Sequence, residues 1–472
     1  MLESVSSSVC DLSAVELAGL IRERDLSARE LVEAHLDRIA DANPKVNAIV
    51  TLAADEARSQ AAAADERQAS GALLGPLHGL PVVHKDLQPT RGIRTTLGSR
   101  IFADFIPDFD SLLVERVRAA GAIALGKSNT PEFGAGSQTF NEVFGATLNP
   151  WDTTKTCGGS SGGGAVALAC GMAALADGSD LGGSLRNPAS FCGVVGLRTS
   201  AGRVPKWPNP FAWSPLSVEG PMARTVGDVA LFLSALAGPD ARAPLSISEP
   251  GSMFAAPLER DFSGVRVAWW KDLGGAPVDR EVRAVTNAQR ALFESLGCIV
   301  EPAEPDFEDV DGTFRTLRFW MSAAALRPAA RQQPRLIKDA LHWEIEQAEK
   351  SSAADVAFAH IRQGEIYERF ARFMNRYEFF VLPVSQVPPF DVTQHYPREI
   401  EGVKMETYID WMKSCYYISM TGAPAISAPC GFTQGGLPIG IQIVGRHRDD
   451  FGVLQMARAF EEAAGVSKAV PL

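Results

Sequence analysis

The residues best suited to chemistry in this chain are two serines in glycine-rich surroundings and a lysine upstream of them. Ser160 lies in the run 158–164, which holds five glycines and two serines, and Ser184 follows a second glycine pair at 182–183. Lys85 precedes both. Serine attacks a carbonyl carbon once a base removes its proton, and glycine lets backbone N–H groups approach the oxyanion that forms. These residues therefore predict acyl transfer.

The base could be a histidine or a lysine. The chain has only seven histidines, and no G-x-S-x-G elbow stands in the strand-to-helix setting of an α/β-hydrolase. A lysine can serve if burial lowers its pKa from about 10.4 by roughly 3 units, which costs about 4 kcal/mol. Lys85 follows the apolar run 80–83, which favours burial, whereas Asp86 would oppose the shift if it faced the same way. By itself, a lysine after an apolar run is more often a surface residue than a catalytic one.

The glycine-rich segment has two other interpretations. Its composition fits a flexible linker, but it borders the apolar, helix-prone run 165–169 rather than polar sequence. A phosphate-binding loop would need a lysine and a hydroxyl residue directly after the glycines, and this chain lacks them. A nucleotide site is therefore not expected.

Helices alternating with short apolar strands must position these residues. Capping boxes at 13–16 and 27–30 predict two amphipathic helices. Apolar runs at 80–83 and 122–126 predict strands, and a strand followed by a helix is predicted within 439–464. This alternation indicates an α/β sheet covered on both faces, whose strand ends would carry the chemistry.

Charge and composition limit the partners and the compartment. A net charge of −11 argues against a nucleic-acid partner, and 46% hydrophobic with 21% charged residues is typical of a soluble globular enzyme. The sequence shows neither a secretory signal nor an apolar stretch long enough for a membrane span. Seven cysteines without a C-x-x-C pair suggest neither a zinc ribbon nor a disulfide framework. We therefore expect a cytoplasmic protein.

Five blocks of the chain resemble, in order, the motifs of the amidase signature family. The lysine motif is at 79–86, the central signature is at 156–164, 178–189 and 193–199, and a C-terminal strand motif lies within 428–442. The resemblance covers nearly the whole chain and adds a family to the chemistry argued from the residues.

The resemblance implies a fold and a division of the chain. It implies a single amidase signature domain over 1–472, with a mixed, mostly parallel central sheet covered on both faces by helices. The catalytic core is expected at 75–235. A variable helical region at 264–381 is expected to contribute to the substrate pocket.

Residue by residue, the resemblance implies a Ser–Ser–Lys triad. Ser184 would be the nucleophile, Ser160 would relay the proton, and Lys85 would be the terminal base. The peptide bond between Gly159 and Ser160 is implied to be cis. Attack by Ser184 would give an acyl-enzyme that water then hydrolyses, with no metal and no organic cofactor.

The same resemblance implies an oxyanion hole and supporting residues. Three departures from the family pattern are visible: Ser179 replaces threonine, Leu185 replaces isoleucine, and Arg198-Thr199 replaces lysine-proline. The last of these puts the loop geometry, rather than the reaction, in question. The implied oxyanion donors are the N–H groups of Leu181, Gly182, Gly183 and Ser184, and the implied supporting residues are Ser161, Asp180 and Arg186.

Aromatic and small residues near the signature indicate the substrate class. They suggest an apolar cavity for aryl or alkyl amides, with carbamates and esters as related substrates, although the same aromatics could simply form core. The pocket candidates are Phe133, Gly134, Ala135, Gly136, Trp213 and Trp320.

Two other functions compete with hydrolysis of such amides. Within the family, the chain could be the glutaminase component of a tRNA-dependent amidotransferase, which would need partner proteins. From another class, it could be a catalytically silent binding scaffold. For an amidase, the expected partner is a small-molecule amide or carbamate, with no nucleic acid and no membrane, and a homo-oligomer is left open.

Overall fold

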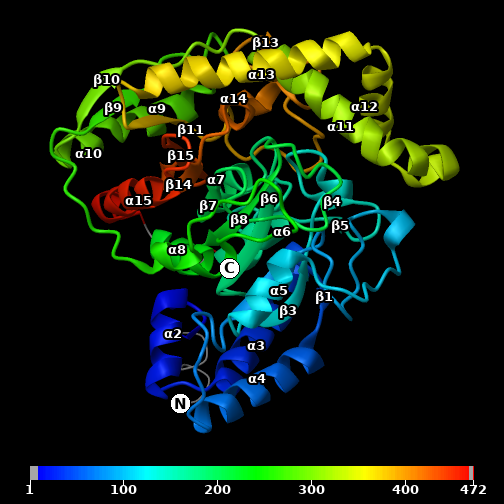
Figure 1. Ribbon diagram of the computed structural model, residues 1–472, viewed down its shortest axis with the longest axis vertical. Coiled ribbons are helices and arrows are strands. Elements are labelled where there is room, and N and C mark those ends of the chain that lie inside the picture. The colour runs from blue at the N-terminus through cyan, green and yellow to red at the C-terminus, as the bar shows by residue number, and fades with distance from the viewer. Residues whose placement is uncertain (1–8, 467–470, 472) are drawn as a thin grey trace.

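One large sheet organises the molecule, and the computed structural model describes it through residues 9–466 and 471 (Figure 1). Eleven strands follow the order β1-β3-β2-β6-β8-β7-β14-β15-β11-β9-β10. Two small two-stranded sheets pair β4 with β5 and β12 with β13. The strands are β1 Ile49–Leu52, β2 Pro81–Lys85, β3 Ile123–Ser128, β4 Phe140–Asn141, β5 Gly145–Ala146, β6 Leu175–Asp180, β7 Val195–Arg198, β8 Val218–Ala223, β9 Arg266–Trp269, β10 Ile299–Pro302, β11 Phe379–Pro383, β12 Glu399–Ile400, β13 Val403–Lys404, β14 Ala425–Phe432 and β15 Pro438–Val444.

The sheet is mixed, as expected, but parallel pairs are not in the majority. Four of its ten pairings are parallel: β3 with β2, β2 with β6, β11 with β9, and β9 with β10. The centre, from β6 to β11, is antiparallel. The connections explain this, because β14 and β15 are joined by a short hairpin and no helix crosses between β7 and β8. The expectation of a mostly parallel sheet was therefore wrong.

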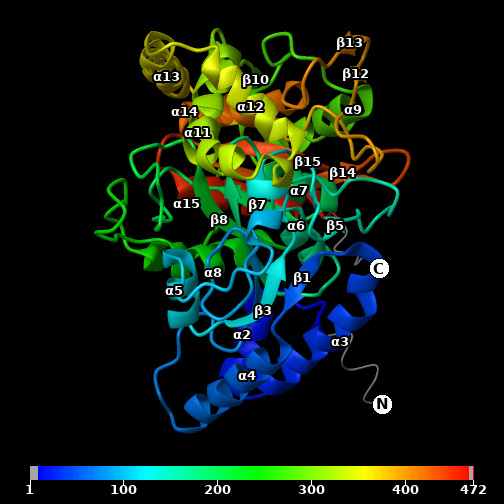
Figure 2. The ribbon, with the colours of Figure 1, turned by 90° about the vertical axis from the view of Figure 1, so that its right-hand side faces the viewer.

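Helices cover both faces of the sheet. Neighbouring residues of a strand point to opposite faces, and Val82 packs into one apolar cluster whereas Val83 packs into another. At one end of the molecule lie α11, α12 and α13, and at the other lie α2, α3 and α4 (Figures 1 and 2). The helices are α2 Ala14–Glu23, α3 Ala28–Val46, α4 Ala54–Ala69, α5 Leu112–Ala119, α6 Gly162–Ala169, α7 Arg186–Cys192, α8 Val226–Leu236, α9 Arg280–Ala288, α10 Arg290–Ser295, α11 Val310–Gln332, α12 Asp339–Glu349, α13 Ala353–Met374, α14 Lys413–Thr421 and α15 Asp450–Ala464.

The two N-terminal helices begin where the capping boxes predict. The Ser13 hydroxyl accepts from the backbone N–H of Glu16, and the Glu16 carboxylate accepts from the backbone N–H of Ser13. Ser27 and Glu30 repeat this arrangement at the start of α3. Each box satisfies N–H groups that the first helical turn leaves free, so these short motifs determine both helix starts.

The glycine-rich segment is packed inside the molecule. All eight residues of α6 are buried. A Cβ atom on Gly163 would lie 2.2 Å from the backbone nitrogen of Asn129, just beyond β3. Only glycine permits this approach of α6 to the sheet, and the linker interpretation is therefore wrong.

Strand pairing brings the catalytic candidates to one edge. β2 and β6 are parallel neighbours, with Val82 opposite Leu175. Their carboxyl ends, which carry Lys85 and Asp180, therefore lie side by side, where α/β proteins place their sites.

Within 9–466, no helix combines the length and the apolar character needed to cross a bilayer.

Candidate active site

Lys85 ends β2 in a fully buried position among three serine hydroxyls. Its Nζ donates to Ser160 Oγ at 2.7 Å, to Ser161 Oγ at 2.9 Å and to Ser179 Oγ at 3.1 Å. The structure thus brings together the lysine and the first serine pair of the sequence analysis. It adds Ser179, which the sequence had marked only as a replacement for threonine.

Burial gives Lys85 the character of a base. It lowers the pKa of the ammonium to about 7, against an opposing effect of Asp180 and Asp177. A neutral amine has two N–H donors and one lone pair, so it can donate to two of the three hydroxyls and accept from the third. The arrangement therefore allows Lys85 to take a proton from a serine near neutral pH.

Asp177 fixes the strand end that carries Lys85, and the sequence analysis missed it. Its Oδ1 accepts from the backbone N–H of Lys85 at 3.0 Å, and its Oδ2 bonds to Nδ1 of His84. Both partners lie on β2 and Asp177 lies on β6, so the contact depends on the pairing of these strands. No local motif could have signalled it.

Ser160, Ser161 and Ser184 come together across the start of α6. The Gly159–Ser160 peptide bond is cis, as the resemblance implied. The backbone N–H of Ser161 donates to the carbonyl of Ser184 at 3.1 Å. Lys85 is fully enclosed and Ser160 is 2% exposed, whereas Ser184 is 9% exposed. Ser184 is therefore the residue of the three that a substrate reaches most easily.

Three of the four N–H groups that the resemblance implied as oxyanion donors are unpaired in the described part of the chain. Among the residues that the structure describes, the N–H groups of Leu181, Gly182 and Ser184 have no acceptor. The N–H of Gly183 instead donates to Asp180 Oδ1 at 2.9 Å, so it is already paired. Gly183 matters through its conformation, because its φ is 114° and a Cβ there would lie 2.5 Å from Cys415 Cβ.

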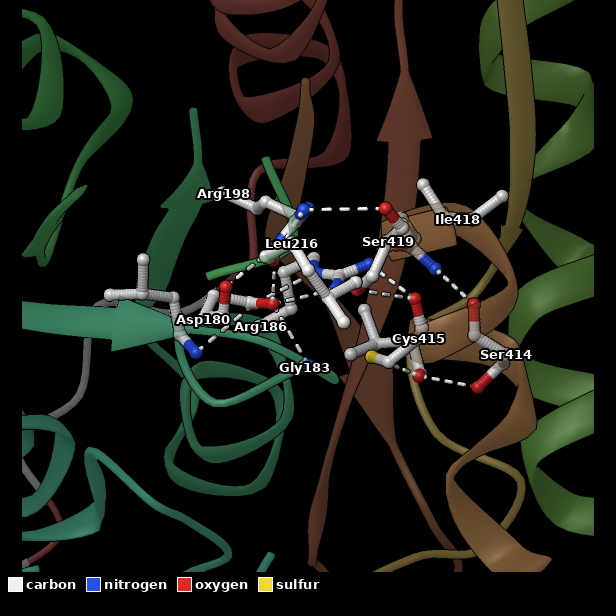
Figure 3. A network of polar contacts seen from close by, with 12 residues as sticks. Asp180, Gly183, Arg186, Arg198, Leu216, Ser414, Cys415, Ile418 and Ser419 are labelled. Carbon is white, nitrogen blue, oxygen red and sulfur yellow. Dashed lines mark hydrogen bonds and ion pairs between the residues drawn. The ribbon is translucent and has the colours of Figure 1, made fainter. Parts of the chain in front are cut away.

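Asp180 is the anchor of this loop (Figure 3). Its carboxylate accepts from Arg186 Nε at 3.0 Å and Nη2 at 2.9 Å, and from Arg198 Nη1 at 3.1 Å. Burial alone would raise the pKa of Asp180, but the two guanidinium groups outweigh it and hold that pKa well below its usual range. The carboxylate therefore stays charged and keeps the N–H groups of Gly183 and Leu185 directed toward it.

Four of the six pocket candidates line two separate cavities. Ala135 and Gly136 line a larger one of about 790 Å³. Trp213 and Trp320 line a smaller, aromatic one of about 310 Å³.

The other two candidates line neither cavity. Gly134 lies beside the serines, because a Cβ on it would be 3.5 Å from Ser160 Oγ. Phe133 packs edge-to-face against Phe102, with ring centroids 6.2 Å apart.

The alternative that the aromatics form core holds for some of them only. Trp213 is 77% exposed and Trp320 is 39% exposed, so neither is a core residue. Phe319, on the same helix as Trp320, is buried in the main apolar cluster.

In the described residues, no group of three or more histidine, cysteine or carboxylate side chains is placed to hold a metal ion.

Comparison with known proteins identifies the family. The family model described as Amidase matches residues 30–454. The chain belongs to the amidase signature family. It is 37% identical to an acylamidase of Rhodococcus erythropolis, with 95% of each chain covered, and 35% identical to a glutamyl-tRNA(Gln) amidotransferase subunit of Synechococcus sp. (strain CC9605), with 96% of each covered.

Solved structures agree with this membership. The crystal structure of a bacterial aryl acylamidase of the amidase signature family superimposes with a TM-score of 0.91 at 29% identity, and 98% of each chain is covered. The protein is thus an amidohydrolase of this family. The silent-scaffold alternative loses its support.

Proposed function

We propose that this amidase hydrolyses apolar aryl or alkyl amides, and related carbamates and esters, through Ser184, Ser160 and Lys85. The observation that carries the proposal is the buried Lys85 amine, which contacts Ser160 and two further hydroxyls and whose pKa burial lowers to about 7. Such a lysine can replace histidine as the base of a serine hydrolase.

The reaction begins with proton transfer and attack. Neutral Lys85 accepts the proton of Ser160, Ser160 accepts the proton of Ser184, and Ser184 Oγ bonds to the carbonyl carbon as the C=O π bond breaks. The negative charge on the carbonyl oxygen is held by the N–H groups of Leu181, Gly182 and Ser184, which stabilise the intermediate more than the ground state.

Collapse of the intermediate expels the amine. The C–N bond breaks, and the proton on Lys85 returns through Ser160 to the departing nitrogen. Water then attacks the acyl-enzyme by the same route, giving the carboxylic acid and free Ser184. Carbamates and esters share the attacked carbonyl, so the same groups serve for them.

The smaller cavity supports the substrate class. A Cβ on Gly182 would lie 3.1 Å from the ring of Phe314, on α11. Leu317 and Met321 continue the same face of that helix and line the cavity with Trp213. Phe314 thus packs against the loop before Ser184 on the same helix that lines the cavity, and we propose that these aromatic surroundings take the apolar group of a substrate bound at Ser184.

A substrate panel tests the proposal. The purified chain is assayed alone with 4-nitroacetanilide, acetamide, an aryl carbamate and an aryl ester, in parallel with Ser184→Ala. We expect a higher kcat/KM for the anilide than for acetamide, and loss of turnover in Ser184→Ala. Equal kcat/KM for the anilide and acetamide would overturn the substrate class, and an active Ser184→Ala would overturn the nucleophile.

The glutaminase function is the second candidate, and the 35% identity to a glutamyl-tRNA(Gln) amidotransferase component favours it. It predicts hydrolysis of glutamine that requires partner proteins, with no anilide turnover by the chain alone.

A cytoplasmic location and a homo-oligomer stay predictions. All seven cysteines are buried and unpaired, which supports a reducing compartment.

A further inference from the structure

Arg198 connects the oxyanion loop to the wall of the smaller cavity. It ends β7 and is buried. Its Nη1 donates to the backbone carbonyl of Asp180 at 2.6 Å and to the Asp180 carboxylate at 3.1 Å. Its Nη2 donates to the carbonyls of Leu216 at 3.1 Å and Ser419 at 3.4 Å (Figure 3). One guanidinium group thus holds three separate segments.

At one end, Arg198 acts on the residue that orients the oxyanion loop. The Asp180 oxygen that it contacts is also the acceptor of the Gly183 N–H. A displacement of Arg198 would therefore shift this carboxylate and, with it, the loop that carries Ser184.

At the other end, Arg198 holds a wall of the aromatic cavity. Leu216 lines that cavity with Trp213, and both belong to the irregular connection between β7 and β8. Since this connection has no helix or strand of its own, side-chain bonds to its carbonyls determine where it lies. The bond from Arg198 is such a contact.

We propose that Arg198 is a positioning residue that determines specificity, because it sets the cavity wall at Leu216 relative to the oxyanion loop at Asp180. The proposal rests on the proposed function, in which the cavity takes the apolar group of the substrate. Arg198 touches no substrate atom and acts through the two segments that it joins.

The chemistry of the guanidinium group explains why arginine suits this position. Its two Nη atoms diverge in one plane and can serve acceptors on different sides, whereas a lysine offers one nitrogen. A lysine could therefore keep the contact with Asp180 while releasing Leu216. Replacement of Arg198 by lysine separates the two contacts without removing the positive charge.

The test compares 4-nitroacetanilide with acetamide, which has no group large enough to reach the cavity. In Arg198→Lys, the ratio of kcat/KM for the two substrates should fall about tenfold, the effect of losing one hydrogen bond from a charged donor. Most of the change should appear in KM for the anilide. If the role of Arg198 were purely structural, kcat/KM would fall equally for both substrates. An unchanged ratio of the two kcat/KM values would overturn the proposal.

A double-mutant cycle tests whether Arg198 acts through Leu216. Leu216→Ala removes the wall side chain but keeps the carbonyl, and it should also lower the ratio. The two changes should be non-additive, so that the double variant is little worse than the more severe single one. Additive effects would contradict the proposal. A Leu216→Ala variant with the ratio of the wild type would contradict it even if Arg198→Lys folds poorly.

Arg224→Lys is the matched control. Arg224 lies after β8, outside the connection between β7 and β8, and its guanidinium group also donates to backbone carbonyls of separate segments, those of Leu12, Leu168 and Ala173. In this control variant, the ratio of kcat/KM for the two substrates should equal that of the wild type. A fall as large as that in Arg198→Lys would overturn the proposal. A wild type without preference for the anilide would overturn the proposed substrate class as well, whereas a preference that is unchanged in Arg198→Lys overturns this inference alone.

Discussion

At the residue scale, the proposed chemistry depends on a lysine that burial makes a base. Lys85 has no exposed surface, and the hydroxyls of Ser160, Ser161 and Ser179 complete its polar surroundings. If Ser161 and Ser179 accept hydrogen bonds from the two N–H groups of the neutral Lys85 amine, its lone pair is left for the hydroxyl of Ser160. The role that histidine has in many serine hydrolases then comes from desolvation and hydroxyl contacts.

The pH dependence of kcat/KM tests this role. Because the base must be neutral and its pKa is about 7, kcat/KM for the anilide should fall as the pH drops below that value and level off above it. Lys85→Ala should lose the activity. Lys127→Met is the matched control: Lys127 is also fully buried with a lowered pKa, but it bonds to Gln88 and Thr90 and should keep the acidic limb.

Ser179 gives a second prediction at this scale. In Ser179→Ala, Lys85 loses one of its three hydroxyl partners, so kcat/KM for the anilide should fall about tenfold, the order of one hydrogen bond to a charged group. Ser179→Thr keeps the hydroxyl and should retain most of the activity. Equal activity in the two variants would show that the hydroxyl does not position the lysine.

At the scale of elements, the oxyanion loop is held by its surroundings. Asp180 ends β6, α7 begins at Arg186, and the buried ion pair between these two residues closes the loop between them. The Gly183 N–H is used for this anchoring, so the three donors that remain belong to Leu181, Gly182 and Ser184. Preorganised donors of this kind need no rearrangement when the oxyanion forms.

Gly183→Ala tests the loop. The φ of 114° and the approach to Cys415 leave no room for a Cβ, so the loop must move and kcat should fall by about two orders of magnitude, the effect of losing an oxyanion donor. Gly435→Ala is the control, because its added Cβ would meet only an ordinary contact at 3.7 Å. Wild-type kcat in Gly183→Ala would contradict the loop assignment.

Local sequence signals predicted where helices begin, but they did not predict the contacts between distant segments. Capping boxes located the starts of α2 and α3, since those bonds join residues three positions apart. The bond from Arg198 to Leu216 and the diversion of the Gly183 N–H to Asp180 arise only when separate segments meet. No periodicity or short motif contains that information, so the sequence could not show that the Gly183 N–H is already paired.

At the scale of the whole molecule, the sheet and the cavities also depend on contacts between distant segments, which the sequence could not predict. The sequence predicted an α/β protein covered on both faces, and the family resemblance located Lys85 and the serines that contact it. The strand order was not predictable, because antiparallel pairing at the centre depends on how distant segments such as β11 and β15 meet. For the same reason, the sequence did not show that four of the pocket candidates line two separate cavities and that the other two line neither.

Trp213→Ala tests the aromatic cavity. Because the side chain is exposed, the melting temperature should change little, whereas KM for the anilide should rise by roughly tenfold through loss of an aromatic contact. Phe358→Ala, an exposed aromatic on α13 outside the cavity, should leave KM unchanged. An unchanged KM in Trp213→Ala would remove this cavity from the substrate site.

The most direct test of the proposed function is the turnover of 4-nitroacetanilide by the purified chain alone, with wild type and Ser184→Ala measured side by side. We predict steady release of the nitroaniline by the wild type, and a fall in kcat of several orders of magnitude in Ser184→Ala at unchanged folding. Comparable turnover by the two proteins would contradict the assignment of Ser184. No anilide turnover by the wild type, together with glutamine hydrolysis only when partner proteins are added, would contradict the proposed function.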